Sequence, residues 1–386
     1  MGKNSKTDSL VEYVYVHIPF CLKKCDYCSF FSEKYSKATK EIFLTYLHKE
    51  IEKYQQQFAI RPKTIYFGGG TPSLLNDLEI TNLIESIGVE SKNIEITLEA
   101  NPINITRNYS ELLSETLVNR ISLGAQSFLD NELKLLGRLH NAKQICAAFE
   151  FLRNSGFENI SLDLIYGLPN QKKKDVEFSV NKIIELNPEH VSIYCLSLEK
   201  NVPLFEKKIQ IPDDGTVSDF YYLIREKLIS AGYLQYEISN FAKKDFESKH
   251  NLTYWNDKPY LGFGPSASGY LKICNSQRNP QLFRYSNPAN MKKYFKQIET
   301  SDLFENFTKL TEKEYEEEFT FLSLRKTKGI NLAEFRDKFG IDFKKKYASV
   351  IEKYSRNDFL RMDGEYLRLT PKAYFVSNEI FAEFLR

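Results

Sequence analysis

The sequence predicts an α/β protein in which about six strand and helix units form a parallel sheet, followed by a small, mostly helical domain. Three observations lead to this prediction. The chain has 386 residues, which exceeds one average domain. Strand-like apolar runs alternate with helical periodicity up to about residue 200. From about residue 290 a Lys/Glu-rich helical texture replaces this alternation. A partial (β/α)6 barrel is therefore expected, although the count also allows an open doubly wound sheet.

The elements of the first part follow from local patterns. Segments 41–58 and 143–156 repeat apolar residues at helical spacing, and Gly156 is placed to end the second helix as a cap. Strands that alternate with such helices form βαβ units, whose functional residues gather at the carboxyl ends of the strands. The predicted strands are 11–18, 63–68, 94–100, 120–124, 160–167 and 190–198.

The last hundred residues predict a second, smaller unit. Helical segments at 293–300, 312–329 and 331–340 precede a strand-like stretch at 360–370 and a final helix. This order is typical of a small helical domain with a β-hairpin. The expected organisation is a barrel at 11–240, a connecting segment at 241–290 and a C-terminal domain at 291–386.

Composition excludes several classes of protein. Lys and Arg number 53 against 51 Asp and Glu, so the net charge is +2 and a dedicated nucleic-acid binder is disfavoured. No stretch approaches the roughly 20 apolar residues of a membrane span. The first residues lack the apolar core of a secretory signal, so a cytoplasmic location is expected.

Three cysteines fall within eight residues, and their spacing is the strongest chemical feature of the sequence. Cys21, Cys25 and Cys28 form a C-x3-C-x2-C pattern on a predicted loop directly after a strand. A structural zinc site needs four ligands, so it would have to recruit His17, and no second cysteine pair supports it. The common ferredoxin spacings do not match either. Spacing alone favours a metal cluster that keeps one open coordination position.

The other three cysteines are isolated. Cys146, Cys195 and Cys274 each stand far from any other cysteine. Because free cysteine usually packs as a small buried hydrophobic residue, we expect no chemistry from these three.

The cysteine loop resembles a known superfamily. The pattern C-x3-C-x-aromatic-C, with Tyr27 as the aromatic residue, is similar to the signature of radical S-adenosylmethionine (radical SAM) proteins. The block YVHIPFC, which contains Tyr15, resembles the branch with oxygen-independent coproporphyrinogen III oxidase and the HemW-type heme chaperones. The resemblance implies a partial (β/α)6 barrel, a winged-helix-like C-terminal domain, and a [4Fe-4S] cluster on Cys21, Cys25 and Cys28 that binds SAM.

The same resemblance implies a set of SAM contacts at strand ends. A glycine-rich segment follows the strand at 63–68, and glycine lets a ligand approach the backbone closely. Asp163 interrupts an apolar strand, which is costly unless the charge is paired or binds a ligand. An ion pair between Asp163 and Arg138 is the structural alternative. The expected SAM contacts are Tyr15, Tyr27, Gly69, Gly70, Thr71, Glu99, Gln126, Arg138 and Asp163.

Two features separate the members of this branch. Phe30 stands where the oxidase has a further cysteine. The segment H-N-x-x-Y-W, which contains the only tryptophan of the chain, resembles the motif of the heme chaperones. An imidazole between aromatic side chains suits heme, although such a histidine is also commonly a hydrogen-bonded structural residue. The expected heme-binding residues are His250, Asn251, Tyr254 and Trp255.

Three glycines after this motif predict a tight loop. Gly262, Gly264 and Gly269 do not have the spacing of a dinucleotide-binding fingerprint. We expect them to bring the backbone close to the ligand pocket.

The sequence therefore favours a heme chaperone with a SAM-coordinated [4Fe-4S] cluster over an enzyme, and no catalytic residue is assigned. The alternative is a coproporphyrinogen III oxidase, a radical SAM oxidative decarboxylase. A zinc-holding binding module is the third reading. As partners we expect heme, hemoprotein acceptors such as respiratory enzymes, transient contact with membranes and a second copy of the chain in a homodimer, but no nucleic acid.

Overall fold

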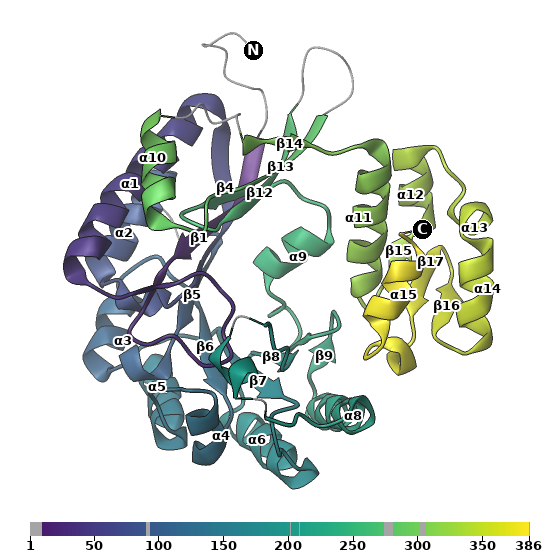
Figure 1. The fold of residues 1–386 in the computed structure, drawn as a ribbon, viewed down its shortest axis with the longest axis horizontal. Coiled ribbons are helices and arrows are strands. Elements are labelled where there is room, and N and C mark those ends of the chain that lie inside the picture. The colour runs from purple at the N-terminus through teal and green to yellow at the C-terminus, as the bar shows by residue number, and fades with distance from the viewer. Residues whose placement is uncertain are drawn as a thin grey trace.

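The computed structural model describes residues 10–89, 93–200, 202–207, 209–273, 281–300 and 306–385. Its main element is a nine-stranded sheet in the order β11-β1-β4-β5-β6-β7-β8-β10-β9. In Figure 1 these strands follow an arc, with helices on the outer side and α9 (Lys249–Trp255) on the inner side. The mixed α/β fold and the curved parallel sheet confirm the predicted fold class.

Six strands form the parallel centre of the sheet, and each falls on a predicted run. Every one pairs in parallel with the next along the order. They are β1 (Leu10–Ile18), β4 (Ala59–Gly69), β5 (Glu95–Ala100), β6 (Arg120–Gln126), β7 (Ile160–Tyr166) and β8 (His190–Cys195).

Short strands extend both edges of this parallel core. At one edge β11 (Leu261–Phe263) pairs in parallel with β1. At the other, β10 (Asn240–Ala242) is antiparallel to β8 and to β9 (Leu234–Gln235). Because β10 and β11 join the main sheet, part of the expected connecting segment belongs structurally to the barrel.

Helices cover the outer face, and their ends carry the caps that the sequence supplies. Asn76 and Glu79 form a capping box at the start of α2, and Gly88 ends that helix in the left-handed region. The outer helices are α1 (Lys37–Gln57), α2 (Asp77–Ile87), α3 (Arg107–Ser114), α4 (Asp130–Leu135), α5 (Ala142–Asn154), α6 (Lys173–Leu186) and α8 (Asp214–Ser230).

Short elements complete the loops at the carboxyl ends of the strands. They are β2 (Phe20–Cys21), β3 (Glu33–Lys34), the 3-10 turns η1 (Pro72–Leu74) and η2 (Pro102–Asn104), and α7 (Pro203–Glu206). None of the described helices combines the length and the apolar character that a membrane span requires.

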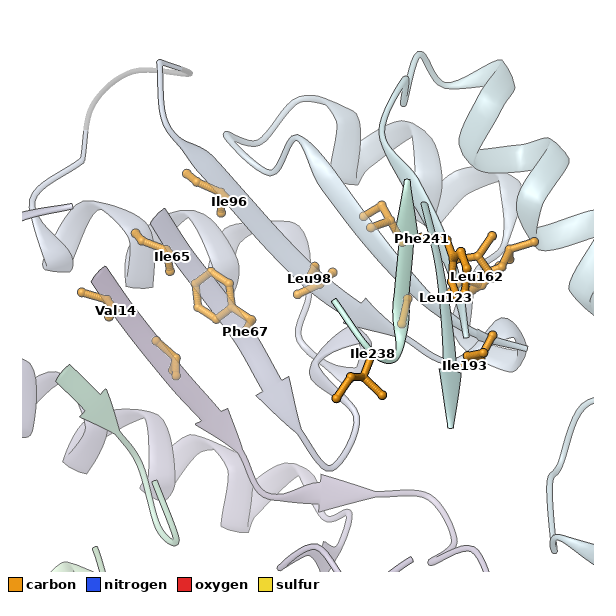
Figure 2. Packing of buried hydrophobic residues seen from close by; sticks show 14 of the residues in the cluster. Val14, Ile65, Phe67, Ile96, Leu98, Leu123, Leu162, Ile193, Ile238 and Phe241 are labelled. Atoms are coloured by element: carbon orange, nitrogen blue, oxygen red, sulfur yellow. The ribbon is translucent and has the colours of Figure 1, made fainter. Parts of the chain in front are cut away.

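The hydrophobic core lies between the strands and the outer helices. Successive strand residues point to opposite faces of a sheet, and in the middle of these strands every second residue is apolar and buried. Figure 2 shows these side chains on neighbouring strands, among them Val14, Ile65, Phe67, Ile96, Leu98, Leu123 and Leu162. The alternate residues face the inside of the barrel and are mostly polar, whereas most barrels of this kind fill the inside with branched apolar side chains.

Behind the barrel, a small antiparallel sheet leads to the C-terminal domain. It contains β12 (Ser268–Ile273), β13 (Gln281–Ser286) and β14 (Thr308–Lys309), and α10 (Met291–Thr300) packs on α1. The domain has a three-stranded sheet, β15-β17-β16, among helices, which agrees with the expected helical domain with a hairpin. Its elements are α11 (Glu312–Arg325), β15 (Ile330–Asn331), α12 (Leu332–Phe339), α13 (Phe343–Lys346), α14 (Ala348–Arg356), β16 (Leu360–Asp363), β17 (Tyr366–Leu369), η4 (Pro371–Ala373) and α15 (Ser377–Glu383).

Candidate functional site

The three clustered cysteines lie on the loop that follows β1. Their thiols are free and partly exposed. The backbone N–H of Asp26, within the loop, donates to the carbonyl of Leu136 at 3.0 Å, and that of Leu204 donates to Asp26 at 2.8 Å. Two distant segments therefore hold the loop in place over the barrel mouth.

All three cysteines line one cavity of about 420 Å³ at the carboxyl ends of the strands. Eight of the nine residues that we expect to contact SAM line the same cavity, which brings together side chains from five strand ends and the cysteine loop. The ninth, Tyr15, does not line it, and its hydroxyl is 3.0 Å from His17 Nδ1. The eight are Tyr27, Gly69, Gly70, Thr71, Glu99, Gln126, Arg138 and Asp163.

The donor set fits a cluster better than a single metal ion. Among the described residues, no three Cys, His, Asp or Glu side chains converge closely enough to hold one ion. His17, the histidine of the zinc alternative, has Nδ1 near Tyr15 and Nε2 3.0 Å from the carbonyl of Phe31. A [4Fe-4S] cluster instead takes one thiolate per iron, so three cysteines around a cavity suit it.

The glycine segment after β4 brings the backbone close to the cysteine loop. A Cβ atom on Gly70 would lie 2.7 Å from the carbonyl oxygen of Phe20, and Gly69 adopts a φ of 109°. Both positions therefore require glycine. Thr71 is the next residue, and its Oγ1 lies 3.5 Å from Cys21 Sγ. The glycine segment therefore forms one wall of the cavity beside the first cysteine.

Arg138 connects the cysteine loop to β6. Its Nη2 donates to the carbonyl of Gly124 at 2.9 Å, and its Nη1 lies 3.5 Å from Cys25 Sγ. The guanidinium therefore places a positive charge beside the sulfur of the second cysteine. Arg138 thus belongs to the cysteine side of the cavity.

Glu99 is held at the end of β5 by two donors. Tyr66 Oη donates to its Oε1 at 2.9 Å, and the backbone N–H of Gly69 donates to its Oε2 at 3.1 Å. Burial nevertheless raises the pKa of Glu99 to about 7. The carboxylate can therefore gain or lose its charge near neutral pH.

Asp163 does not form the ion pair with Arg138 that the sequence offered as its structural alternative. Its oxygens accept instead from Ser122 Oγ at 3.2 Å and from Ser161 Oγ at 3.4 Å. Burial raises the pKa of Asp163, while hydrogen bonds from serine hydroxyls, that of Ser192 first, oppose this rise. The alternative is wrong because Arg138 is turned toward Cys25 and Gly124.

Several cavity residues were missed by sequence reasoning. Tyr66, Ser122 and Tyr194 share the inward faces of the strands with the predicted residues, so the strand alternation alone could have indicated them. Cys195 also lines the cavity and is exposed, which contradicts the expectation that it is buried. It is exposed because β8 ends there, at the barrel mouth. Cys274 lies outside the described residues.

The H-N-x-x-Y-W segment lies on α9, and none of its four predicted residues lines the cavity. Helix α9 meets the barrel near the start of β5, where Glu95 accepts from the backbone N–H groups of Lys249 and His250 at 3.1 and 2.9 Å. His250 lies 5.1 Å from Tyr66, ring centre to ring centre. The segment thus closes the barrel from the side opposite the cysteines.

Both ring nitrogens of His250 are engaged. Nδ1 is 2.7 Å from Thr64 Oγ1, and Nε2 is 2.8 Å from Tyr254 Oη. The side chain is 1% exposed, and burial, assisted by the charge of Arg120, lowers its pKa to about 3. His250 is therefore a neutral, hydrogen-bonded imidazole in this structure. Whether it also binds heme stays a prediction.

The C-terminal domain contacts α9 directly. The guanidinium of Arg325 lies 4.5 Å from the centre of the Trp255 ring, and Lys326 Nζ donates to Asn256 Oδ1 at 2.8 Å. Asp257 accepts from Lys338 Nζ at 2.8 Å. These contacts join the end of the motif to α11 and α12.

The three glycines after α9 do not line the cavity of the cysteines, and their approach to a heme pocket stays a prediction. Gly264 has a φ of 91°, and a Cβ atom there would lie 2.4 Å from the carbonyl oxygen of His17. A Cβ on Gly262 would lie 2.1 Å from the carbonyl oxygen of Ser268, and one on Gly269 would collide with the ring of Tyr285. They allow β11 and β12 to pack tightly against β1 and β13.

Comparison with known families identifies two regions of the chain. Residues 15–183 match the model of the radical SAM superfamily. Residues 310–376 match the model of the HemN C-terminal domain. The first match contains the cysteine loop and most of the cavity residues. The second match contains most of the C-terminal domain.

Curated proteins similar to this chain are described as heme chaperones. The chain is 36% identical over 379 residues to heme chaperone HemW of Lactococcus lactis, which covers 96% of both chains. It is 34% identical over 381 residues to heme chaperone HemW of Bacillus subtilis, covering 96% of this chain and 98% of that protein.

Among solved structures, coproporphyrinogen III oxidase of Escherichia coli superposes with a TM-score of 0.81. The match covers 98% of this chain and 90% of that one, at 22% identity. At this identity the likeness establishes the fold alone.

Proposed function

This chain belongs to the HemW heme chaperone family of the radical SAM superfamily, and from that premise we propose that it binds heme and delivers it to hemoprotein acceptors. The observation that carries the proposal is the similarity to these relatives along the whole chain, C-terminal domain included. Phe30, which lines the cavity and is 67% exposed, also supports the proposal. Coproporphyrinogen III oxidase, the alternative within this branch, has a cysteine at that position.

A [4Fe-4S] cluster and SAM are the cofactors of this superfamily, and the cavity suits both. Cys21, Cys25 and Cys28 would hold the cluster, which supplies an iron without a protein ligand where SAM binds. The strand-end residues that line the cavity shape the space around this iron. We assign SAM binding to Tyr27, Gly69, Gly70, Thr71, Glu99, Gln126, Arg138 and Asp163, with Tyr15 behind them.

We assign heme binding to the H-N-x-x-Y-W segment, with His250 as the axial ligand. In the arrangement described above His250 already has two hydrogen-bond partners, Thr64 and Tyr254. Ligation of iron would therefore require His250 to give up at least one of these hydrogen bonds. Asn251, Tyr254 and Trp255 are only partly buried, so they are the members of the segment that a heme could contact first.

Partners, location and domain limits complete the proposal. Respiratory hemoproteins are the proposed acceptors, and the proposed location is the cytoplasm. Transient contact with membranes would let the protein reach membrane-bound acceptors, and a homodimer is the proposed assembly. We retain the barrel, connecting segment and C-terminal domain at 11–240, 241–290 and 291–386, although β11 and β14 cross these limits in their strand pairing.

An anaerobic assay tests the proposal against the oxidase alternative. Protein reconstituted with iron, sulfide and SAM is titrated with heme and, separately, incubated with coproporphyrinogen III and a reductant. We expect saturable heme binding, seen in the Soret band, and no decarboxylated porphyrin. Protoporphyrinogen formation would reverse the assignment in favour of the oxidase.

The position of the heme ligand is tested by substitution. His250→Ala should weaken heme binding and shift the Soret band, because the imidazole is lost while the aromatic side chains remain. An unchanged spectrum would show that another residue is the axial ligand, and Tyr254 and Cys274 are then the next residues to replace.

A further inference from the structure

A buried arginine lies inside the barrel, behind the cavity. Arg120 begins β6, is 1% exposed and is the largest fully buried side chain among the described residues. It occupies the inward position immediately before Ser122, which lines the cavity, but it does not line the cavity itself. Within the described part of the chain it forms no ion pair within 4.0 Å, and its Nε has no hydrogen-bond partner.

Such a group is unfavourable unless nearby charges compensate it, because burial removes the hydration of the guanidinium. Two carboxylates lie on the neighbouring strands, Glu99 on β5 and Asp163 on β7. Arg120 pairs in register with Thr97, two residues before Glu99, and Ser122, two residues after Arg120, donates to Asp163 at 3.2 Å. The charge of Arg120 lowers the pKa of both carboxyl groups, against the rise that burial causes. Both line the cavity, and both are buried among hydroxyl groups instead of basic side chains. Arg120 is thus the positive charge that these two carboxylates share.

The charges inside the barrel match those of the proposed ligand. Within this group of three side chains, two ionised carboxylates and one guanidinium leave one net negative charge. The sulfonium of SAM carries one positive charge that it cannot lose as a proton. A barrel without the guanidinium would hold two buried negative charges, and one of them would take up a proton instead.

From this balance we propose that Arg120 is a positioning residue for SAM: its buried guanidinium keeps Glu99 and Asp163 ionised together so that both can face the sulfonium. The inference rests on the proposed SAM site and deepens it, because it assigns a role in SAM binding to a residue outside the cavity. It also distinguishes Arg120 from Arg138, which contacts the cysteine side.

The other groups around Glu99 leave Arg120 as the main source of positive charge. Burial raises the pKa of each tyrosine there, so the tyrosines remain neutral at the pH values of interest. His250 and His190 are neutral as well, because burial and the charge of Arg120 lower their pKa values. The titratable groups that face Glu99 are Tyr15, Tyr66, Asp163, Tyr194 and Tyr254.

The proposal predicts a change in the pH dependence of SAM affinity. Burial sets the pKa of Glu99 at about 7, and its carboxylate is ionised above that value. Loss of the guanidinium should raise the pKa of Glu99. As the pH falls, SAM binding that needs the ionised carboxylate should then weaken at a higher pH than in the wild type. A rise from about 7 to about 8 lowers the ionised fraction about threefold at pH 7.5 and about eightfold at pH 6.5, with almost no loss at pH 9.

The experiment measures SAM binding by anaerobic calorimetry from pH 6 to pH 9, on reconstituted wild type and variants. We expect Arg120→Gln to move the affinity profile to higher pH and Arg120→Lys, which keeps a charge, to restore the wild-type profile. Arg325→Gln is the control, because Arg325 is a partly buried guanidinium that pairs with Glu237 at 2.8 Å, outside the cavity. Its profile should stay in place.

A profile in Arg120→Gln that is lowered equally at every pH would overturn the inference, because it would indicate loss of structure instead of loss of charge. If this variant does not fold, the double variant Arg120→Gln/Asp163→Asn provides the test. Removing one charge of each sign should restore folding and thermal stability toward wild type. A double variant that unfolds as readily as the single one would also overturn the inference.

Failure of the proposed function would look different. Wild-type protein that carries its cluster but binds no SAM at any pH would contradict the SAM site itself. Wild-type protein that binds SAM, with Arg120→Gln unchanged at every pH, would contradict only the role of Arg120.

Discussion

His250 offers a prediction whose size follows from the structure. Replacing it with alanine removes both of its hydrogen bonds and leaves the buried hydroxyl of Thr64 without its partner. Each lost bond costs about 1 kcal/mol, and an unsatisfied buried group costs about 1–3 kcal/mol. The space left by the ring adds to this cost. We therefore expect His250→Ala to lower the free energy of unfolding by about 3 kcal/mol, with no heme present.

The assay is urea unfolding of the heme-free protein, followed by tryptophan fluorescence. Trp255 is the only tryptophan of the chain and lies on the same helix as His250, so its emission reports directly on α9. Asn251→Ala, at the next position of this helix, is the matched control and should change stability by less than about 0.5 kcal/mol. Equal unfolding midpoints for the two variants would refute the structural role of His250 and leave only the role of a ligand.

Three further predictions concern the cavity. Cys25→Ala should abolish the visible iron-sulfur absorption of the reconstituted protein, because one of three anchors is lost; full cluster occupancy would contradict it. Asp163→Asn should raise the Kd for SAM about tenfold while the cluster remains, since a charged partner becomes neutral; unchanged affinity with a lower Tm would indicate a purely structural aspartate. Gly70→Ala should lower cluster occupancy, because the added Cβ would lie 2.7 Å from Phe20 O and displace the cysteine loop; Gly88→Ala, which strains the backbone at a φ of 95° but meets no atom with its Cβ, is the control for strain alone and should keep the wild-type absorption.

Local patterns predicted the barrel well, because each strand and helix is specified by nearby residues. The alternation of apolar residues predicted the positions of the six parallel strands. The repeated order of strand and helix predicted that the carboxyl ends of these strands lie together at one mouth of the barrel. The residues expected to contact SAM were implied by the family resemblance, and eight of the nine line one cavity because the inward positions of neighbouring strands meet in space.

The position of α9 could not be predicted in this way. His250 contacts Thr64, which is 186 residues earlier in the chain, and nothing near His250 in the sequence indicates that contact. The pairing of Asp163 with Arg138 failed for a related reason, since the serines that satisfy Asp163 look unremarkable in isolation. Arg120, in contrast, was overlooked although the argument applied to Asp163 also fits it: both are charges on a buried strand.

Heme delivery is the central claim, and transfer of heme to an acceptor tests it most directly. Reconstituted protein loaded with heme is mixed anaerobically with a heme-free respiratory hemoprotein, and the Soret band and the activity of the acceptor are followed. The account predicts that the spectrum of the acceptor appears faster than with the same concentration of free heme. Heme that stays on this protein, together with decarboxylation of coproporphyrinogen III by the same preparation, would contradict it.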